Sequence, residues 1–187
     1  MARYWTNLVH IFLALTAYAG AALLLARRSP GSSLLGLLFF LLWGFSELLG
    51  VSTILFAVNR TWRSAYTGAD PGMQEAYRTL LTGFEAVWDS VFFLLLVAFL
   101  LGSLCYGWVA RKGVGLERAV GVLFLLAVPL TLAILISGYG GPLWPGVIVS
   151  WTYPVLQPLS RVLLGVWLWN SAEPNPATSG RVGPGAA

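Results

Sequence analysis

The chain has 187 residues, of which 58% are hydrophobic and only 10% are charged, and its mean hydropathy is +0.78. A soluble domain carries about 25% charged residues, so a single globular core cannot bury this apolar surplus, and the composition indicates a polytopic membrane protein. The formal net charge of +4 does not indicate nucleic acid as a partner, because the basic residues lie mainly at the ends of apolar runs, as membrane anchoring requires.

Apolar runs of about 20 residues predict membrane-spanning helices. Such runs cover residues 5–26, 34–58, 87–110, 120–137 and 143–169. Basic pairs follow the first and third runs, and three prolines interrupt the fifth. The sequence therefore predicts an all-α polytopic membrane bundle over residues 1–170, with about five transmembrane helices, of which proline breaks the last.

Polar segments separate and follow these runs. The stretch NRTWRSAYTGADPGMQEAYRT, residues 59–79, is expected to be the only substantial loop. The tail over residues 171–187 is rich in Pro, Gly and small residues, which predicts disorder. A cleaved signal peptide is the rival interpretation of the first run, since TAYAG offers a small-x-small cleavage site, but the apolar residues continue past that site to Ala26.

The basic residues are distributed unevenly between the two predicted sides of the membrane. One side carries Arg27, Arg28, Arg111, Lys112, Arg118 and Arg181. The other side carries Arg3, Arg60, Arg63 and Arg78. Because cytoplasmic segments carry the excess of Lys and Arg, this distribution predicts a cytoplasmic C-terminus.

Three stretches resemble a known family. They are FFLLWGFSELLGVSTILF at 39–56, VFFLLLVAFLLGSLCYGWVARKGVGLERAVGVLFLLA at 91–127 and PLSRVLLGVWLWN at 158–170. Together they are similar to bacterial multi-spanning proteins catalogued as domain of unknown function 4386, over roughly residues 8–170. The chain departs from the family in lacking one amino-terminal span and in placing Arg161 where an acid is expected. The resemblance implies a multi-pass protein of the bacterial plasma (inner) membrane and brings no known activity.

Two opposite charges lie deep within the predicted spans. A charge at the centre of a spanning helix costs about 2.5–3.5 kcal/mol, so it needs a partner or a purpose. Glu47 lies near the middle of the second span, and Arg161 is the only cation at comparable depth. We therefore expect a Glu47–Arg161 ion pair between the second and fifth spans. Such a pair either only fixes helix register, or forms the floor of a cavity lined by Trp43, Ser46, Gln157 and Ser160.

A second acidic pair, Glu85 and Asp89, lies one helical turn apart just before the third apolar run. Both residues are expected in the first turns of a helix, where its dipole favours negative charge. They are interpreted as a capped, interfacial helix start; the alternative is an acidic outer mouth that attracts a cation.

The single cysteine, histidine and lysine argue against metal sites, catalytic triads and Schiff-base cofactors. Cys105 is the only cysteine and His10 the only histidine, so no metal set or catalytic triad can be assembled, and no metal or cofactor is expected. Lys112, the only lysine, lies in a predicted loop, which excludes a retinal Schiff base. His10 is expected to snorkel or to make an interhelical hydrogen bond.

Three classes of function remain open. The first is a non-catalytic protein that binds a lipophilic small molecule or packs as an accessory subunit of a membrane complex. The second is a small transporter with a mid-membrane polar site at Glu47 and Arg161. The third is an intramembrane enzyme that uses Glu47 as acid or base. The expected partners are accordingly the lipid bilayer and either a lipophilic molecule or a membrane subunit.

Overall fold

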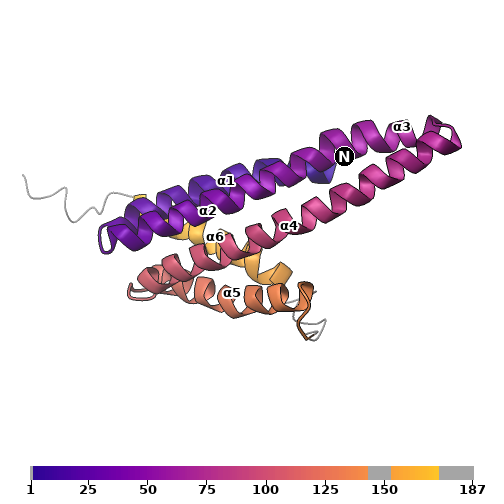
Figure 1. Cartoon of the computed structure of the whole chain (residues 1–187). Coiled ribbons are helices and arrows are strands. Elements are labelled where there is room, and N and C mark those ends of the chain that lie inside the picture. The colour runs from indigo at the N-terminus through magenta and orange to yellow at the C-terminus, as the bar shows by residue number, and fades with distance from the viewer. Residues whose placement is uncertain (1, 143–152, 173–187) are drawn as a thin grey trace, which may run out of the picture.

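The computed structural model describes residues 2–142 and 153–172, and all regular structure within them is helical (Figure 1). The elements are α1 (Ala2–Ala26), α2 (Pro30–Ser52), η1 (Thr53–Trp62), α3 (Arg63–Gly68), α4 (Pro71–Ala110), α5 (Leu116–Gly138) and α6 (Tyr153–Ala172). Four continuous helical stretches among the described residues are long and apolar enough to cross a membrane: Arg3–Ala26, Pro30–Gly68, Pro71–Ala110 and Leu116–Gly138. The predicted all-α polytopic bundle is thereby confirmed.

The fifth predicted span is described only in part. Its carboxyl-terminal half is α6, which ends at Ala172, and its first ten residues, 143–152, lie outside the described residues. The predicted disorder of the tail falls on residues that lie, from position 173 onward, outside the described part as well.

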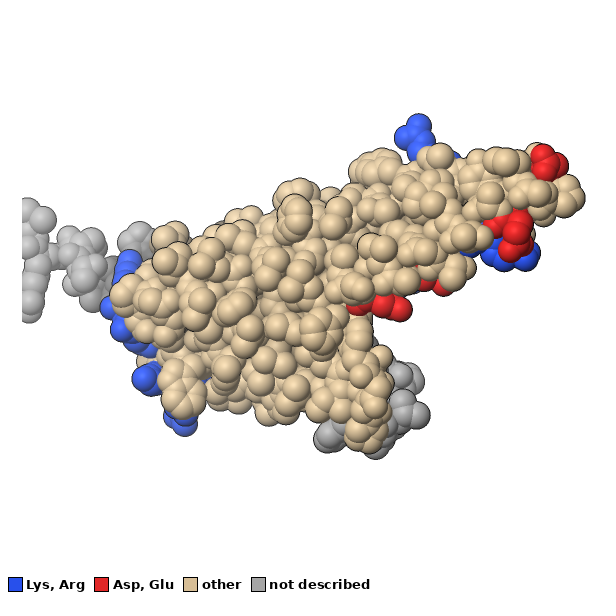
Figure 2. Space-filling model, viewed as in Figure 1, with Lys and Arg blue, Asp and Glu red and all other residues tan. Residues whose placement is uncertain are grey.

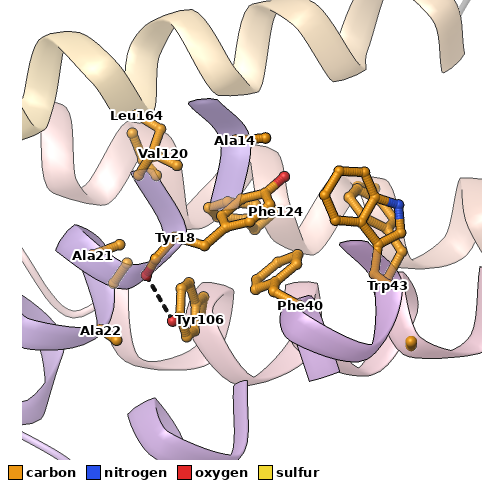
Figure 3. Packing of buried hydrophobic residues seen from close by; sticks show 14 of the residues in the cluster. Ala14, Tyr18, Ala21, Ala22, Phe40, Trp43, Tyr106, Val120, Phe124 and Leu164 are labelled. Atoms are coloured by element: carbon orange, nitrogen blue, oxygen red, sulfur yellow. Dashed lines mark hydrogen bonds between the residues drawn. The ribbon is translucent and has the colours of Figure 1, made fainter. Parts of the chain in front are cut away.

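An aromatic core joins the helices. The Tyr18 ring of α1 stacks on Phe40 of α2, with centroids 3.8 Å apart and planes 11° apart. Phe124 of α5 packs against both rings (Figure 3). Phe99 of α4 contacts Phe40 edge-on. Tyr106 of α4 lies beside Phe40 and donates a hydrogen bond from its hydroxyl to the backbone oxygen of Tyr18, at 2.9 Å. These contacts hold α1, α2, α4 and α5 together near the middle of the bundle.

The expected loop at residues 59–79 is wrong, because this stretch is helical except for a short turn. α2 continues through η1 and α3 to Gly68, and α4 begins again at Pro71. The turn has a local cause: Ala69 is extended, Asp70 Oδ1 accepts the Met73 backbone N–H at 3.0 Å, and Pro71 opens α4.

The two long helices form a hairpin that outreaches the rest of the bundle (Figure 1). α4 has 40 residues, which at 1.5 Å per residue is about 60 Å, twice the roughly 30 Å of a bilayer's hydrocarbon core. The far third of the hairpin, around α3, extends beyond the ends of α1 and α5 (Figure 1). The polar residues in this region therefore do not end the helices. They belong to the part of the hairpin that exceeds the thickness of a bilayer's hydrocarbon core.

Basic side chains collect at the opposite end of the bundle from the hairpin tip (Figure 2). This basic end comprises the α1–α2 and α4–α5 connections, with Arg27, Arg28, Arg111, Lys112 and Arg118. Arg28 forms an ion pair with Glu117, which ties the two connections together, and the Arg111 guanidinium lies 3.7 Å from the centroid of the Trp108 ring.

Candidate functional site

The most polar cluster inside the bundle is centred on Arg161 of α6. Its Nη1 lies 2.6 Å from His10 Nε2 of α1, and its Nη2 donates to Gln157 Oε1 at 2.8 Å. Its Nε lies 3.5 Å from the Tyr18 hydroxyl, and the guanidinium carbon lies 5.2 Å from the centroid of the Trp43 ring. Three helices thus supply hydrogen-bonding partners and an aromatic face to one partly buried cation.

The contact with His10 defines the state of the imidazole. An arginine has only donors and stays protonated, so His10 Nε2 must be the acceptor. The imidazole is therefore neutral, with its proton on Nδ1. The prediction that the only histidine makes an interhelical hydrogen bond is confirmed, and its partner is the deep arginine.

Tyr18 connects this cluster to the aromatic core. Its ring is fully buried, its hydroxyl faces Arg161, and its backbone oxygen accepts the hydrogen bond from Tyr106. Figure 3 shows the ring of Tyr18 beside Phe40 and Phe124, with the bond to Tyr106 dashed. Tyr18 therefore contacts both Arg161 and the aromatic residues that pack α1 against α2 and α4.

The expected Glu47–Arg161 ion pair is not formed, and that prediction is wrong. Within residues 2–142 and 153–172 the ion pairs are Arg28–Glu117 and Arg78–Glu75. Glu47 interacts electrostatically with Arg161 outside salt-bridge distance, and its side chain forms a hydrogen bond with Asn7 of α1. The reason is competition: neutral acceptors from α1 and α6 reach the guanidinium first and satisfy it without a second buried charge.

Glu47 instead lines a cavity of about 400 Å³ between α1, α2, α4 and α6. Its polar lining residues are Arg3, Tyr4, Asn7, Glu47 and Gln157. Its apolar lining residues are Val51, Ile54, Trp88, Phe92, Leu95 and Leu96. Arg3 and Tyr4 come from the first turn of α1. Its volume falls within the 300–1,000 Å³ that is usual for small-molecule sites.

The structure brings only part of the predicted lining to the cavity. Of the six predicted residues, Glu47 and Gln157 line it, and Gln157 also holds Arg161. Trp43 is 2% exposed and belongs to the aromatic core, with its ring toward Arg161. Ser46 and Ser160 are buried away from the lining, and Ser160 donates to the Gln157 backbone oxygen at 2.8 Å.

Several lining residues were not predicted. Asn7 and Arg3 lie at the start of the first helix and carry no periodic signal that separates them from an ordinary interfacial end. The Trp88 ring packs directly on Gly50 of α2 and contributes to the apolar lining. A small residue such as Gly50 in a spanning helix is the sequence signal for this close approach.

Glu85 and Asp89 are not a helix start. They lie in the middle of α4, whose N-cap is Asp70, and both are exposed. Neither lines the cavity, although Trp88 between them does. The backbone oxygen of Asp89 accepts a 2.5 Å hydrogen bond from the Tyr139 hydroxyl, which joins α4 to the end of α5. The interpretation of Glu85 and Asp89 as a capped helix start is therefore wrong, whereas the acidic outer mouth stays a prediction.

Within the described part of the chain, no three His, Cys, Asp or Glu side chains come together in a way that could hold a metal ion. Comparisons of the chain with protein-family models, with curated proteins and with solved structures find no match. The site must therefore be interpreted from its own geometry.

Proposed function

We propose that this protein is a non-catalytic, multi-pass protein of the bacterial plasma membrane, with a cytoplasmic C-terminus, that binds a lipophilic small molecule in the cavity beside Glu47. The observation that carries the proposal is the mixed lining of this cavity. Glu47, Asn7 and Gln157 contribute hydrogen-bonding groups, and Trp88 and Phe92 contribute apolar surface. Such a lining fits a molecule with an apolar body and one polar end.

Glu47 gives the polar end its expected chemistry. The Arg161 guanidinium beside it is already bonded to His10 and Gln157, so the carboxylate faces the cavity without a cationic partner in salt-bridge contact among the described residues. A ligand with a hydrogen-bond donor or an ammonium group at one end satisfies such a carboxylate. The proposed ligand is therefore a lipophilic amine or alcohol.

Native mass spectrometry of gently extracted protein tests this proposal. The wild-type chain should carry an additional mass of a small molecule, and Glu47→Gln should lose it. Glu85→Gln is the matched control, because it removes the same charge from an exposed position outside the cavity and should keep the bound mass. A wild-type chain without any bound molecule, or equal retention in both variants, would contradict the proposal.

A small transporter is the second candidate. The observation in its favour is the ten-residue π-helix η1, which contributes Ile54 to the cavity wall; π-helical turns are uncommon and occur frequently at functional sites. Release of the co-purified molecule across the membrane of reconstituted vesicles, abolished by Glu47→Gln, would favour transport over binding alone.

A further inference from the structure

A second hollow lies on a different face of the bundle, between α5 and α6. It is a shallow, apolar groove of about 470 Å³. Its lining consists of Gly115, Ala119, Val122, Leu123, Leu159 and Leu163, with Arg118 at one end. It shares no residue with the cavity beside Glu47.

The groove runs from the basic end of the bundle toward its middle. Arg118 and Ala119 lie in the first turn of α5, and Leu123 lies five residues further along, which is about 8 Å at 1.5 Å per residue. Val122 is 44% exposed and Leu159 is 46% exposed. In a membrane, such exposed apolar side chains at this depth face acyl chains.

Arg118 has no acidic partner within the described residues. The carboxylate next to it in sequence, Glu117, is engaged with Arg28 of the α1–α2 connection. Arg118 itself is exposed and forms none of the ion pairs or side-chain hydrogen bonds of the described chain. Because Arg111 and Lys112 lie in the same connection, the local field at the head of the groove is positive (Figure 2).

We propose that the α5–α6 groove binds an anionic phospholipid, with the headgroup phosphate on Arg118 and one acyl chain along the apolar lining. Guanidinium pairs with phosphate through two parallel charge-assisted hydrogen bonds, and the acyl chain fills a groove whose lining is otherwise aliphatic. Basic residues at the cytoplasmic face of a membrane attract anionic lipid in the same way. A zwitterionic lipid offers the same phosphate, but its ammonium group cancels the headgroup charge, so the basic end of the bundle attracts it less strongly.

Lipid titration followed by native mass spectrometry tests the assignment. The full chain, stripped of lipid in a non-ionic detergent, is titrated with phosphatidylglycerol or with phosphatidylcholine. Phosphatidylglycerol should bind about tenfold more tightly, because its headgroup carries a net negative charge at the basic end of the bundle. Arg118→Gln should remove this preference. Arg27→Gln, which deletes one exposed charge at the same end outside the groove, should change the affinity by about twofold or less.

A groove-filling variant makes the test independent of charge. Ala119→Trp places an indole in the exposed lining and should weaken the binding of both lipids, with the thermal stability unchanged. Equal binding of the two lipids by the wild type would overturn the proposal, as would equal effects of Arg27→Gln and Arg118→Gln. A stable dimer that Ala119→Trp dissociates would assign the groove to a second copy of the chain and overturn it as well.

Discussion

Arg161 Nη1 lies 2.6 Å from His10 Nε2, so the guanidinium of α6 donates a hydrogen bond to a neutral imidazole of α1. Gln157 and Tyr18 complete its hydrogen bonds, and Trp43 covers one face of the guanidinium. The bundle thus accommodates a permanent charge through neutral acceptors, and the carboxylate of Glu47 is left to line a cavity.

The pair of His10 and Arg161 should behave as a unit in stability measurements. His10→Leu removes an acceptor from a partly buried guanidinium, and Arg161→Met leaves the imidazole acceptor without its donor; each should cost about 1–3 kcal/mol of unfolding free energy. The double variant removes both polar groups and should recover most of the loss. Thermal unfolding in detergent measures this, and additive losses would show that the two residues are not coupled.

Glu47→Gln should have a much smaller effect on stability. The amide keeps a hydrogen-bonding group beside Asn7 and removes a charge that has no salt-bridge partner among the described residues, so the unfolding free energy should change by about 1 kcal/mol or less. The same thermal unfolding experiment measures it. A loss as large as that of His10→Leu would mean that Glu47 is the true partner of Arg161 after all.

Gly50 should be essential for the shape of the cavity. A Cβ at this position would overlap the Trp88 ring, whereas a Cβ at Gly83, in α4, would meet open space. Gly50→Ala should therefore destabilise the protein by about 1–3 kcal/mol through overpacking. Gly83→Ala should be neutral or stabilising by about 0.5–1 kcal/mol, because alanine is the better helix former. Denaturation of the two variants side by side checks this, and equal stabilities would contradict the packing.

Tyr139 should give the protein an alkaline sensitivity. Burial, followed by the nearby Asp89 carboxylate, raises the pKa of the Tyr139 phenol from its ordinary value of 10.0. The neutral phenol is the donor to the Asp89 backbone oxygen, so its contribution to stability is fully present below pH 10 and is lost as the pH rises through the raised pKa. Between about pH 9 and about pH 12, the melting temperature of Tyr139→Phe should therefore fall less than that of the wild type. Parallel curves would contradict this role.

The sequence predicts the spans well where hydropathy alone decides. α4 ends at Ala110, as the basic pair at 111–112 indicated, and α5 covers the run predicted at 120–137 with four extra residues at its start. It fails over residues 59–79, because polar residues show where a helix leaves the membrane, whereas the ADPG stretch shows where the helix ends. An N-cap aspartate followed by proline marks the start of a helix, and here it locates the turn more accurately than the polar composition of residues 59–79.

The candidate site could be predicted only in outline. Burial cost identified Glu47 and Arg161 as the residues that need an explanation, and both lie at the centre of the polar region. The partner of Arg161 could not be identified, since opposite charge favours Glu47, and the position of α1 against α6 is a property of packing that hydropathy does not encode. His10 and Asn7 therefore became part of the site only through the fold.

The cavity beside Glu47 is tested most directly by the accessibility of two cysteines on different faces of α2, about 3 Å apart along its axis. In a Cys105→Ala background, Val51→Cys lies in the cavity lining, whereas Leu49→Cys replaces a side chain that is 47% exposed and does not line the cavity. A small water-soluble thiol reagent, added to the protein in lipid vesicles, should modify Val51→Cys and leave Leu49→Cys unmodified. Modification of neither position, or of both equally, would contradict a water-accessible cavity beside Glu47.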